Sequence, residues 1–163
     1  SPSMVVADSG PLIALARVGL LRLLPSRFSE VLVPEAVFLE CTRHRDRPGA
    51  LAIVAASEAG LFHQAHVTDA ERFAAEYLLD TGESAALMLA HHHAAPVLVD
   101  ERKARRVASR LGIPVVGTVG VLVAARMDSQ IGPLREIFEA LAVFGYRLSD
   151  ELVREALHRV GEA

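Results

Sequence analysis

Two aspartates each stand directly after a short apolar run. Asp8 follows Val5–Ala7, and Asp100 follows Val97–Val99. Ligands of open parallel sheets bind beyond the carboxyl ends of the strands, so both carboxylates are placed where a site would form. If the two strands are neighbours, about 4.8 Å apart, the two side chains can share one ion. Each aspartate taken alone is equally compatible with a helix N-cap.

Two glutamates extend this pattern. Glu40 lies in a predicted helix, flanked at helical spacing by Val37 and Cys41, and Glu83 lies in the first helical turn after Gly82. In that turn Glu83 could simply complement the helix dipole. Four converging carboxylates are the ligand type that Mg²⁺ and Mn²⁺ prefer. The sequence therefore suggests a divalent-cation site made of oxygen ligands.

The histidine run His91–His93 does not suggest a zinc site. Successive helical side chains point about 100° apart, so three adjacent histidines cannot converge on one ion. We expect them at an exposed helix end.

The elements that must position these acids follow from hydrophobic periodicity and from the Pro and Gly breaks. Strands are predicted at 4–7, 30–33, 61–67, 96–99 and 112–116. Helices are predicted near 11–18, 20–24, 35–42, 50–59, 68–79, 83–93, 101–111, 119–127, 133–144 and 150–160. Thr68 with Glu71 predicts a capping box, and Ser149 predicts an N-cap. Short apolar strands alternating with helices predict an α/β fold, a parallel sheet of about five strands between layers of helices.

The size and composition of the chain favour one domain. The sequence has 163 residues, of which 52% are hydrophobic, and this excludes a disordered chain. We expect a single domain over 4–163 with a helical tail over 130–160, and we expect residues 1–3 to be left from cloning. Apolar runs are far shorter than the roughly 20 residues that span a bilayer. The single cysteine agrees with a reducing compartment, so we expect a cytoplasmic protein.

The net charge of the whole chain does not indicate a nucleic-acid partner. Seventeen Lys and Arg against twenty Asp and Glu give a net charge of −3. The basic residues are nevertheless clustered, and guanidinium groups bind phosphate well. The candidates for RNA contacts are Arg43, Arg45, Arg102, Arg105 and Arg106. An ordinary solvated surface would explain the cluster at Arg43 and Arg45, and the cluster at 102–106, as well as RNA binding would.

Taken together, five motifs resemble a PIN domain, and more narrowly a bacterial and archaeal PIN-like branch long filed as a domain of unknown function. They are VVADSGPLI at 5–13, PEAVFLE at 34–40, GESAA at 82–86, VLVDERKAR at 97–105 and GTVG at 117–120. The resemblance is close over residues 4 to about 127. It implies a three-layer α/β/α sandwich with extra C-terminal helices.

The resemblance also implies an activity, that of a Mg²⁺- or Mn²⁺-dependent ribonuclease like the VapC-type toxins of toxin–antitoxin pairs. By position, Asp8, Glu40, Glu83 and Asp100 would be the catalytic acids and metal ligands, and Thr118 would be the hydroxyl residue that completes or supports the site. The implied partners are an RNA substrate, a small antitoxin protein and a second copy of the chain, with no membrane.

Two positions depart from the family pattern. Many PIN nucleases have Asp where this chain has Glu83, and a second Asp commonly stands where this chain has Glu101. A longer carboxylate moves the ligand oxygen by about one methylene. The alternative is therefore a PIN-like binding or regulatory module with weakened catalysis. A phosphatase with Asp8 as nucleophile ranks last, because Gly10 stands where such enzymes usually have a second Asp.

Overall fold

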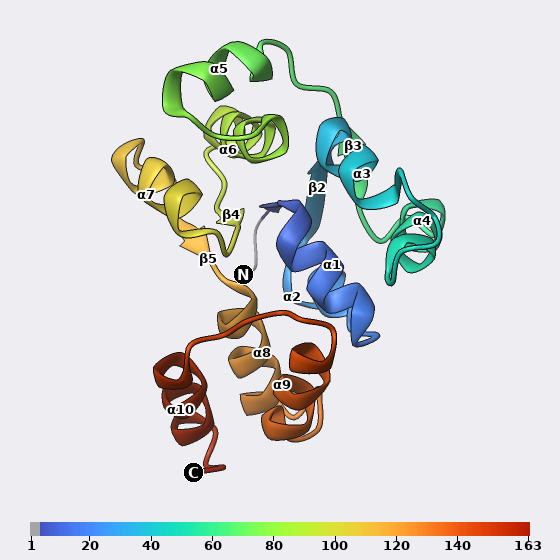
Figure 1. Cartoon of the computed structure of the whole chain (residues 1–163), viewed down its shortest axis with the longest axis vertical. Helices are drawn as coiled ribbons and strands as arrows, with labels where there is room; N and C mark the ends of the chain where they lie inside the picture. The colour runs from blue at the N-terminus through green and yellow to red at the C-terminus, as the bar shows by residue number, and fades with distance from the viewer. Residues whose placement is uncertain (1–3) are drawn as a thin grey trace. The chain divides into compact units, whose positions relative to one another are not determined.

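The computed structural model describes residues 4–163, and the expected cloning remnant at 1–3 lies outside the described residues. The chain forms two compact units, one ending at Gly117 and one spanning Thr118–Ala163. The second unit starts before residue 130, where the helical tail was predicted to begin. The single domain predicted for 4–163 stays a prediction. Figure 1 shows the elements of both units.

The first unit is built on a five-stranded parallel sheet with the order β3-β2-β1-β4-β5. Its strands are β1 (Met4–Ala7), β2 (Glu30–Pro34), β3 (His63–Ala65), β4 (Val97–Leu98) and β5 (Val115–Val116). All five lie within or next to the predicted runs, and β3, β4 and β5 are shorter than predicted. The expectation of a parallel sheet of about five strands is confirmed.

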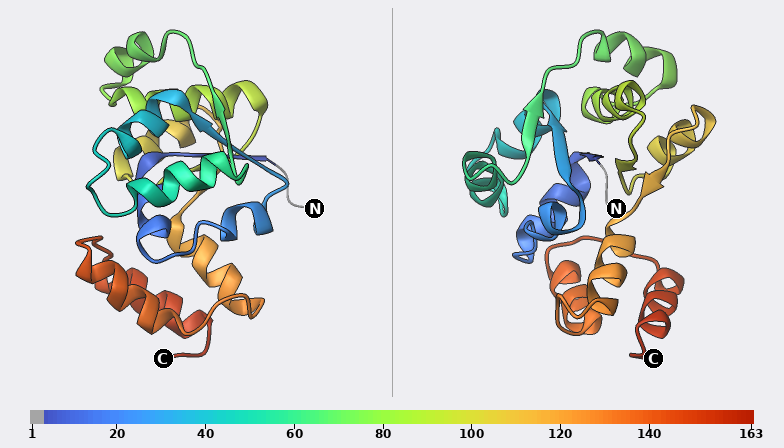
Figure 2. Two further views of the ribbon diagram at one scale, coloured as in Figure 1. Left: turned by 90° about the vertical axis from the view of Figure 1, so that its right-hand side faces the viewer. Right: turned by 180° about the vertical axis from the view of Figure 1, so that it is seen from behind.

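The described residues of the first unit form seven helices. They are α1 (Ser9–Arg17), α2 (Leu23–Arg27), α3 (Glu35–Thr42), α4 (Ala50–Glu58), α5 (Ala70–Tyr77), α6 (Thr81–His93) and α7 (Arg102–Arg110). Helices α1 and α4 lie on one side of the strands, and α6 and α7 lie on the other (Figures 1 and 2). The α/β/α sandwich is confirmed.

The strand side chains on both faces of the sheet are buried, which explains why the strands are continuous apolar runs in the sequence. Val6, Val97 and Val99 pack into one core with α6 and α7. Val5 and Leu98, whose side chains alternate to the opposite face, are completely buried as well. Asp8 follows the last residue of β1, and Asp100 stands two residues after the end of β4.

Three predicted helix boundaries were wrong. The capping box of Thr68 and Glu71 does not form, because Asp69 takes a left-handed φ of 62° and is itself the N-cap of α5. Pro25 does not end a helix but lies in the first turn of α2, where its missing N–H has no intrahelical partner to lose. Helix α6 begins at Thr81, two residues before Glu83, because Asp80 caps it.

The second unit consists of α8 (Thr118–Met127), α9 (Leu134–Val143) and α10 (Asp150–Arg159). The predicted cap is confirmed, since Ser149 Oγ accepts a hydrogen bond of 3.1 Å from the Leu152 amide. The Glu162 carboxylate accepts 2.7 Å and 3.0 Å bonds from the amides of Leu134 and Arg135. None of the helices formed by the described residues is both long and apolar enough to cross a membrane.

Candidate active site

The order in which the chain adds strands to the sheet reverses between β1 and β4. From β1 the chain adds β2 and then β3 on one side, and it returns to add β4 and β5 on the other. Such a switch point opens a crevice beyond the strand ends, where ligands bind in α/β proteins. Ala7 pairs with Leu98, so Asp8 and Asp100 leave adjacent strands at this crevice. The condition stated for a shared ion, that the two strands are neighbours, is met.

Asp8 is the most unusual side chain at this edge. It occupies the N-cap position of α1 in extended conformation, yet its side chain makes no capping hydrogen bond. The residue is only 4% exposed, and among the described residues its Oδ1 has no hydrogen-bond partner. The pKa of Asp8 is raised to about 7, chiefly by burial; the bond from the Ser9 amide opposes the rise, and the charges of Glu83, Glu40 and Asp80 contribute to it. A role as helix N-cap alone does not account for this environment of Asp8.

Glu40 reaches the same place from α3. Ser9 Oγ donates a 2.9 Å hydrogen bond to Glu40 Oε2, which joins the residue after Asp8 to a residue 31 positions further along the chain. Burial raises the pKa of Glu40, and the charge of Asp80 adds to this, while the Ser9 hydroxyl and Arg43 oppose it. Asp8 and Glu40 therefore share one electrostatic environment.

Glu83 arrives from the first turn of α6, where its carboxylate has a structural partner. Its amide donates a 2.7 Å bond to Asp80 Oδ1, and Glu83 Oε1 accepts a 3.2 Å bond from the Asp80 amide. Burial raises the pKa of Glu83, and the hydrogen bond from the Asp80 amide opposes this rise. The charges of Asp80, Glu101 and Glu40 add to the rise. Glu83 is thus both a capping residue and a member of the acid group.

Asp100 lies in a different environment. It follows β4 by two residues, outside the strand, and is half-buried. A Cβ built on Gly117 would lie 3.3 Å from Asp100 Oδ1 and 3.0 Å from Arg105 Nη1. The carboxylate and the guanidinium therefore flank the same point of the backbone, at the start of the basic helix α7.

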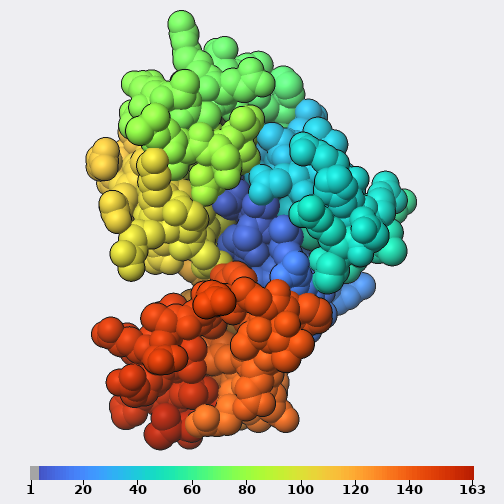
Figure 3. Space-filling model, in the orientation of Figure 1, coloured from blue at the N-terminus to red at the C-terminus, as the bar shows by residue number. Residues whose placement is uncertain are grey.

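Helix α7 carries a positive face. Arg105 and Arg106 are exposed and line, with Asp100, a hollow of about 500 Å³. The basic residues of this helix, none of which takes part in an ion pair between described residues, are Arg102, Lys103, Arg105, Arg106 and Arg110. Helix α7 lies at the surface in Figure 3. This basic face is the strongest feature of the first unit that could attract a polyanion.

The remaining predicted residues lie apart from this acid group or have local roles. Glu101 Oε2 accepts a 2.8 Å bond from the Ala104 amide, so Glu101 is the N-cap of α7. Arg43 and Arg45 are exposed after α3. Thr118 belongs to the second unit as the first residue of α8, and it is fully buried. Its supporting role in the site stays a prediction.

Sequence reasoning missed Asp80, Ser9 and the role of Gly82. Asp80 raises the pKa of each of the three acids Asp8, Glu40 and Glu83. The signal was present: Asp80 and Glu83 have capping-box spacing, and Asp80-Thr-Gly82 repeats the pattern of Asp8-Ser-Gly10. The prediction instead treated residues 80–82 only as a break between helices.

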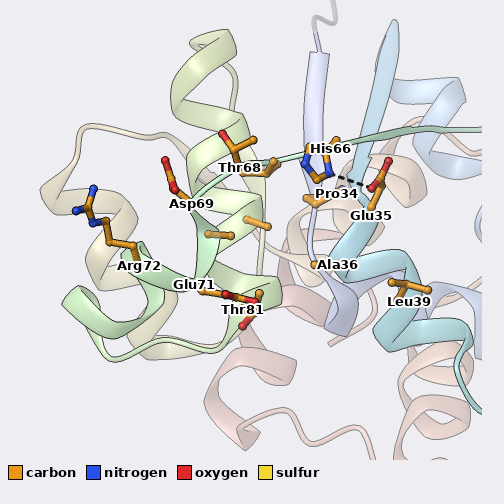
Figure 4. A pocket seen from close by; sticks show the side chains of 13 residues that line it. Pro34, Glu35, Ala36, Leu39, His66, Thr68, Asp69, Glu71, Arg72 and Thr81 are labelled. Atoms are coloured by element: carbon orange, nitrogen blue, oxygen red, sulfur yellow. Dashed lines mark hydrogen bonds and ion pairs between the residues drawn. The ribbon is translucent and has the colours of Figure 1, made fainter.

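A pocket of about 580 Å³ opens between α3, the segment before α5, and the start of α6 (Figure 4). Leu39 and Thr81 line it, and these are the chain neighbours of Glu40 and Gly82. At the top of the view, His66 Nδ1 lies 3.1 Å from Glu35 Oε2. Asp8, Glu40 and Glu83 do not line this pocket themselves.

The donor chemistry fits a hydrated hard cation. All the clustered side chains offer oxygen, and the buried Oδ1 of Asp8 has no partner among the described residues. Within residues 4–163, no group of three or more His, Cys, Asp or Glu lies close enough together to hold a metal ion. Mg²⁺ keeps several of its waters and is commonly held by one or two carboxylates, so an open arrangement suits it.

Comparisons with known proteins agree with this architecture. A family model described as PIN domain matches residues 4–162, almost the whole chain. No curated protein matches the sequence. PIN domains are generally nucleases and generally use divalent metal ions. With its five-stranded parallel sheet and the family match over both units, the chain belongs to the PIN-domain family.

Proposed function

We propose that this protein is a metal-dependent endoribonuclease that hydrolyses phosphodiester bonds of RNA. The observation that carries the proposal is the buried, unpartnered Oδ1 of Asp8 beside Glu40 and Glu83. A buried carboxylate oxygen without a partner is costly unless a cation or proton satisfies it. Membership of a nuclease family supports a catalytic reason for keeping it.

Asp8 and Asp100 are proposed as direct ligands of Mg²⁺ or Mn²⁺, with Glu40 and Glu83 as ligands directly or through water. When bound, the cation supplies Lewis-acid stabilisation of the charge on the scissile phosphate. The protein residues prepare this site: Ser9 orients Glu40, and the Asp80 cap fixes the first turn that carries Glu83. Thr118 is proposed to support the site.

The basic face of α7 is proposed to hold the RNA backbone. Arg102, Arg105 and Arg106 follow directly from Asp100, so phosphates bound there would lie next to the acid-bearing strand end. Arg43 and Arg45 are proposed as weaker contacts near Glu40. Because such contacts release counterions, affinity should fall as salt rises.

The deciding experiment is an Mn²⁺-dependent cleavage assay on single-stranded and structured RNA. The wild type should cut, and both Asp8→Asn and Asp100→Asn should lose most of the activity. Cleavage that continues unchanged in both purified variants would exclude the proposal, because a contaminating nuclease would then explain it.

The RNA-contact part has a separate test that needs no cleavage. In the Asp8→Asn background, Arg105→Gln with Arg106→Gln should reduce the slope of log affinity against log salt by about one per lost phosphate contact. Arg154→Gln, an exposed arginine of α10, is the matched control and should leave the slope unchanged. Equal slopes in all three proteins would remove α7 from the binding surface.

We further propose that the protein is the toxin of a toxin–antitoxin pair in the cytoplasm, neutralised by a small antitoxin protein, and that it forms a homodimer. These proposals rest on the family resemblance. Expression should arrest growth, and Asp8→Asn should abolish the arrest. Size-exclusion chromatography with light scattering would test the dimer, and a monomer at micromolar concentration would exclude it.

The competing function is a PIN-like binding or regulatory module that has lost catalysis. The engagement of Glu83 in a capping box is the observation that favours it. Calorimetry separates the two functions: a folded protein that binds no Mn²⁺ at millimolar metal would support the module and contradict the nuclease.

A further inference from the structure

We infer that Gly82 is a positioning residue, whose missing side chain leaves the space in which the Glu40 carboxylate lies against the start of α6. The inference deepens the proposed function and rests on it for the metal role of Glu40. Gly82 is buried within an ordinary helical turn, and it does not have the positive φ that would demand glycine. The reason for glycine at this position is therefore space rather than backbone conformation.

The available space is very small. A Cβ on Gly82 would lie 2.6 Å from Glu40 Oε1, well inside contact distance, with Asp80 Oδ1 at 3.5 Å and Val37 Cγ2 at 3.6 Å. The closest atom is thus a carboxylate oxygen of a proposed ligand. Any side chain at position 82 must push that oxygen away.

The second oxygen of Glu40 is held from another direction. Ser9 Oγ donates to Oε2 at 2.9 Å, while Oε1 rests against Gly82. Ser9 is the chain neighbour of Asp8, and Gly82 is the chain neighbour of Glu83. Glu40 is therefore positioned by the two segments that supply the other acids of the group, which sets the spacing of the three carboxylates.

An alanine at position 82 should disturb this spacing without unfolding the protein. The atom that it meets is the far end of a flexible side chain, so the carboxylate can rotate away while the backbone stays in place. Alanine is also a better helix former than glycine. Stability and metal binding should therefore change in opposite directions, which a merely structural role for Gly82 would not produce.

Gly10 offers a closely matched control. Gly10 and Gly82 are each the second residue of a helix, and each helix has an aspartate at its N-cap. A Cβ on Gly10 meets nothing within 4 Å. Gly10→Ala therefore repeats the same chemical change at the same helical position, next to the same site, but without the contact to Glu40.

The test compares the metal-free full-length wild type, Gly82→Ala and Gly10→Ala by Mn²⁺ calorimetry, thermal unfolding and the carboxyl ¹³C resonance of Glu40. Gly82→Ala should weaken Mn²⁺ binding roughly tenfold, as expected for a residue that orients a ligand, and should shift the resonance without lowering Tm. Gly10→Ala should keep the wild-type affinity and resonance. An unchanged resonance and affinity in Gly82→Ala would overturn the inference.

A compensating variant provides the second test. Glu40→Asp withdraws the carboxylate by one methylene, so adding Gly82→Ala to Glu40→Asp should cost much less affinity than adding it to the wild type. A full tenfold loss in both backgrounds would also overturn the inference. If the wild type itself binds no Mn²⁺, the proposed function fails, and the Glu40 resonance alone decides whether Gly82 positions the carboxylate.

Discussion

Two helices of the first unit begin with nearly the same residues, but their N-cap aspartates lie in opposite environments. Helix α1 follows Asp8-Ser-Gly10, and α6 follows Asp80-Thr-Gly82, and both aspartates are extended N-cap residues. Asp80 is exposed and accepts a 2.7 Å bond from the Glu83 amide within a complete capping box. Asp8 is 4% exposed, makes no capping bond and keeps Oδ1 without a partner among the described residues.

The difference shows that helix capping explains one aspartate and not the other. Local sequence allows a cap at both places, but Asp8 lies at the end of the central strand, where neighbouring acids and burial disfavour its charge. A buried polar atom without a partner calls for a specific explanation. We therefore treat Asp8 as functional and Asp80 as mainly structural, while Gly82 and Glu83 of the same turn of α6 belong to the proposed site.

The largest expected effect separates the two aspartates by activity. Asp8→Asn should reduce Mn²⁺-dependent RNA cleavage roughly 1,000-fold, because losing a ligand of the metal removes several kcal/mol of charge stabilisation. Asp80→Asn should change the rate only a few-fold, since asparagine caps helices as well as aspartate. Initial rates under identical conditions measure both. Equal losses would erase the functional distinction between the two helix starts.

The pH dependence of stability should also depend on Asp8. The folded pKa of about 7 lies above the ordinary value of 3.8, so between these values the folded protein holds a proton that the unfolded chain has released. Stability of the metal-free protein should therefore fall as pH rises from about 4 to 7, with a slope of up to roughly 1.4 kcal/mol per pH unit from this residue.

Urea unfolding at several pH values measures this slope. Asp8→Asn should remove most of it, whereas Glu40 and Glu83 should contribute a remainder of the same sign, since their pKa values are also raised. An identical slope in the wild type and Asp8→Asn would contradict the assignment.

A smaller effect contrasts the two alanine variants. Asp80→Ala should lower the free energy of unfolding by about 1 kcal/mol through loss of the cap. Asp8→Ala loses no capping bond and removes a poorly solvated charge, so at pH 8 without metal it should stabilise the protein. Denaturant midpoints at pH 8 measure both, and destabilisation of similar size in both variants would show that Asp8 also acts as a cap.

The smallest expected change in stability concerns Glu83. Glutamine can complete a capping box, so Glu83→Gln should change the free energy of unfolding by less than about 0.5 kcal/mol. Its Mn²⁺ affinity should nevertheless fall about tenfold, because glutamine brings no negative charge to the site. A loss of stability without a loss of affinity would reduce Glu83 to a purely structural residue.

The sequence by itself determined much of the architecture. Apolar runs ending in Asp8 and Asp100 predicted two strand ends, and helical spacing placed Glu40 and Glu83 on helices. These predictions succeeded because hydrophobic periodicity is a local property that backbone geometry enforces. The boundary at Thr68 was wrong, since the left-handed turn at Asp69 leaves no clear signal in composition.

Only the tertiary structure decided which of these groups meet. Strand order placed Asp8 at the switch point, a hydrogen bond across 31 residues brought Glu40 to Ser9, and the packing around Gly117 brought Asp100 and Arg105 to the same point. The sequence could not show that Gly82 leaves room for Glu40 or that Asp80 raises the pKa of its neighbours. These relations depend on crossover connections and on burial, which are set by the packing of segments far apart in the chain.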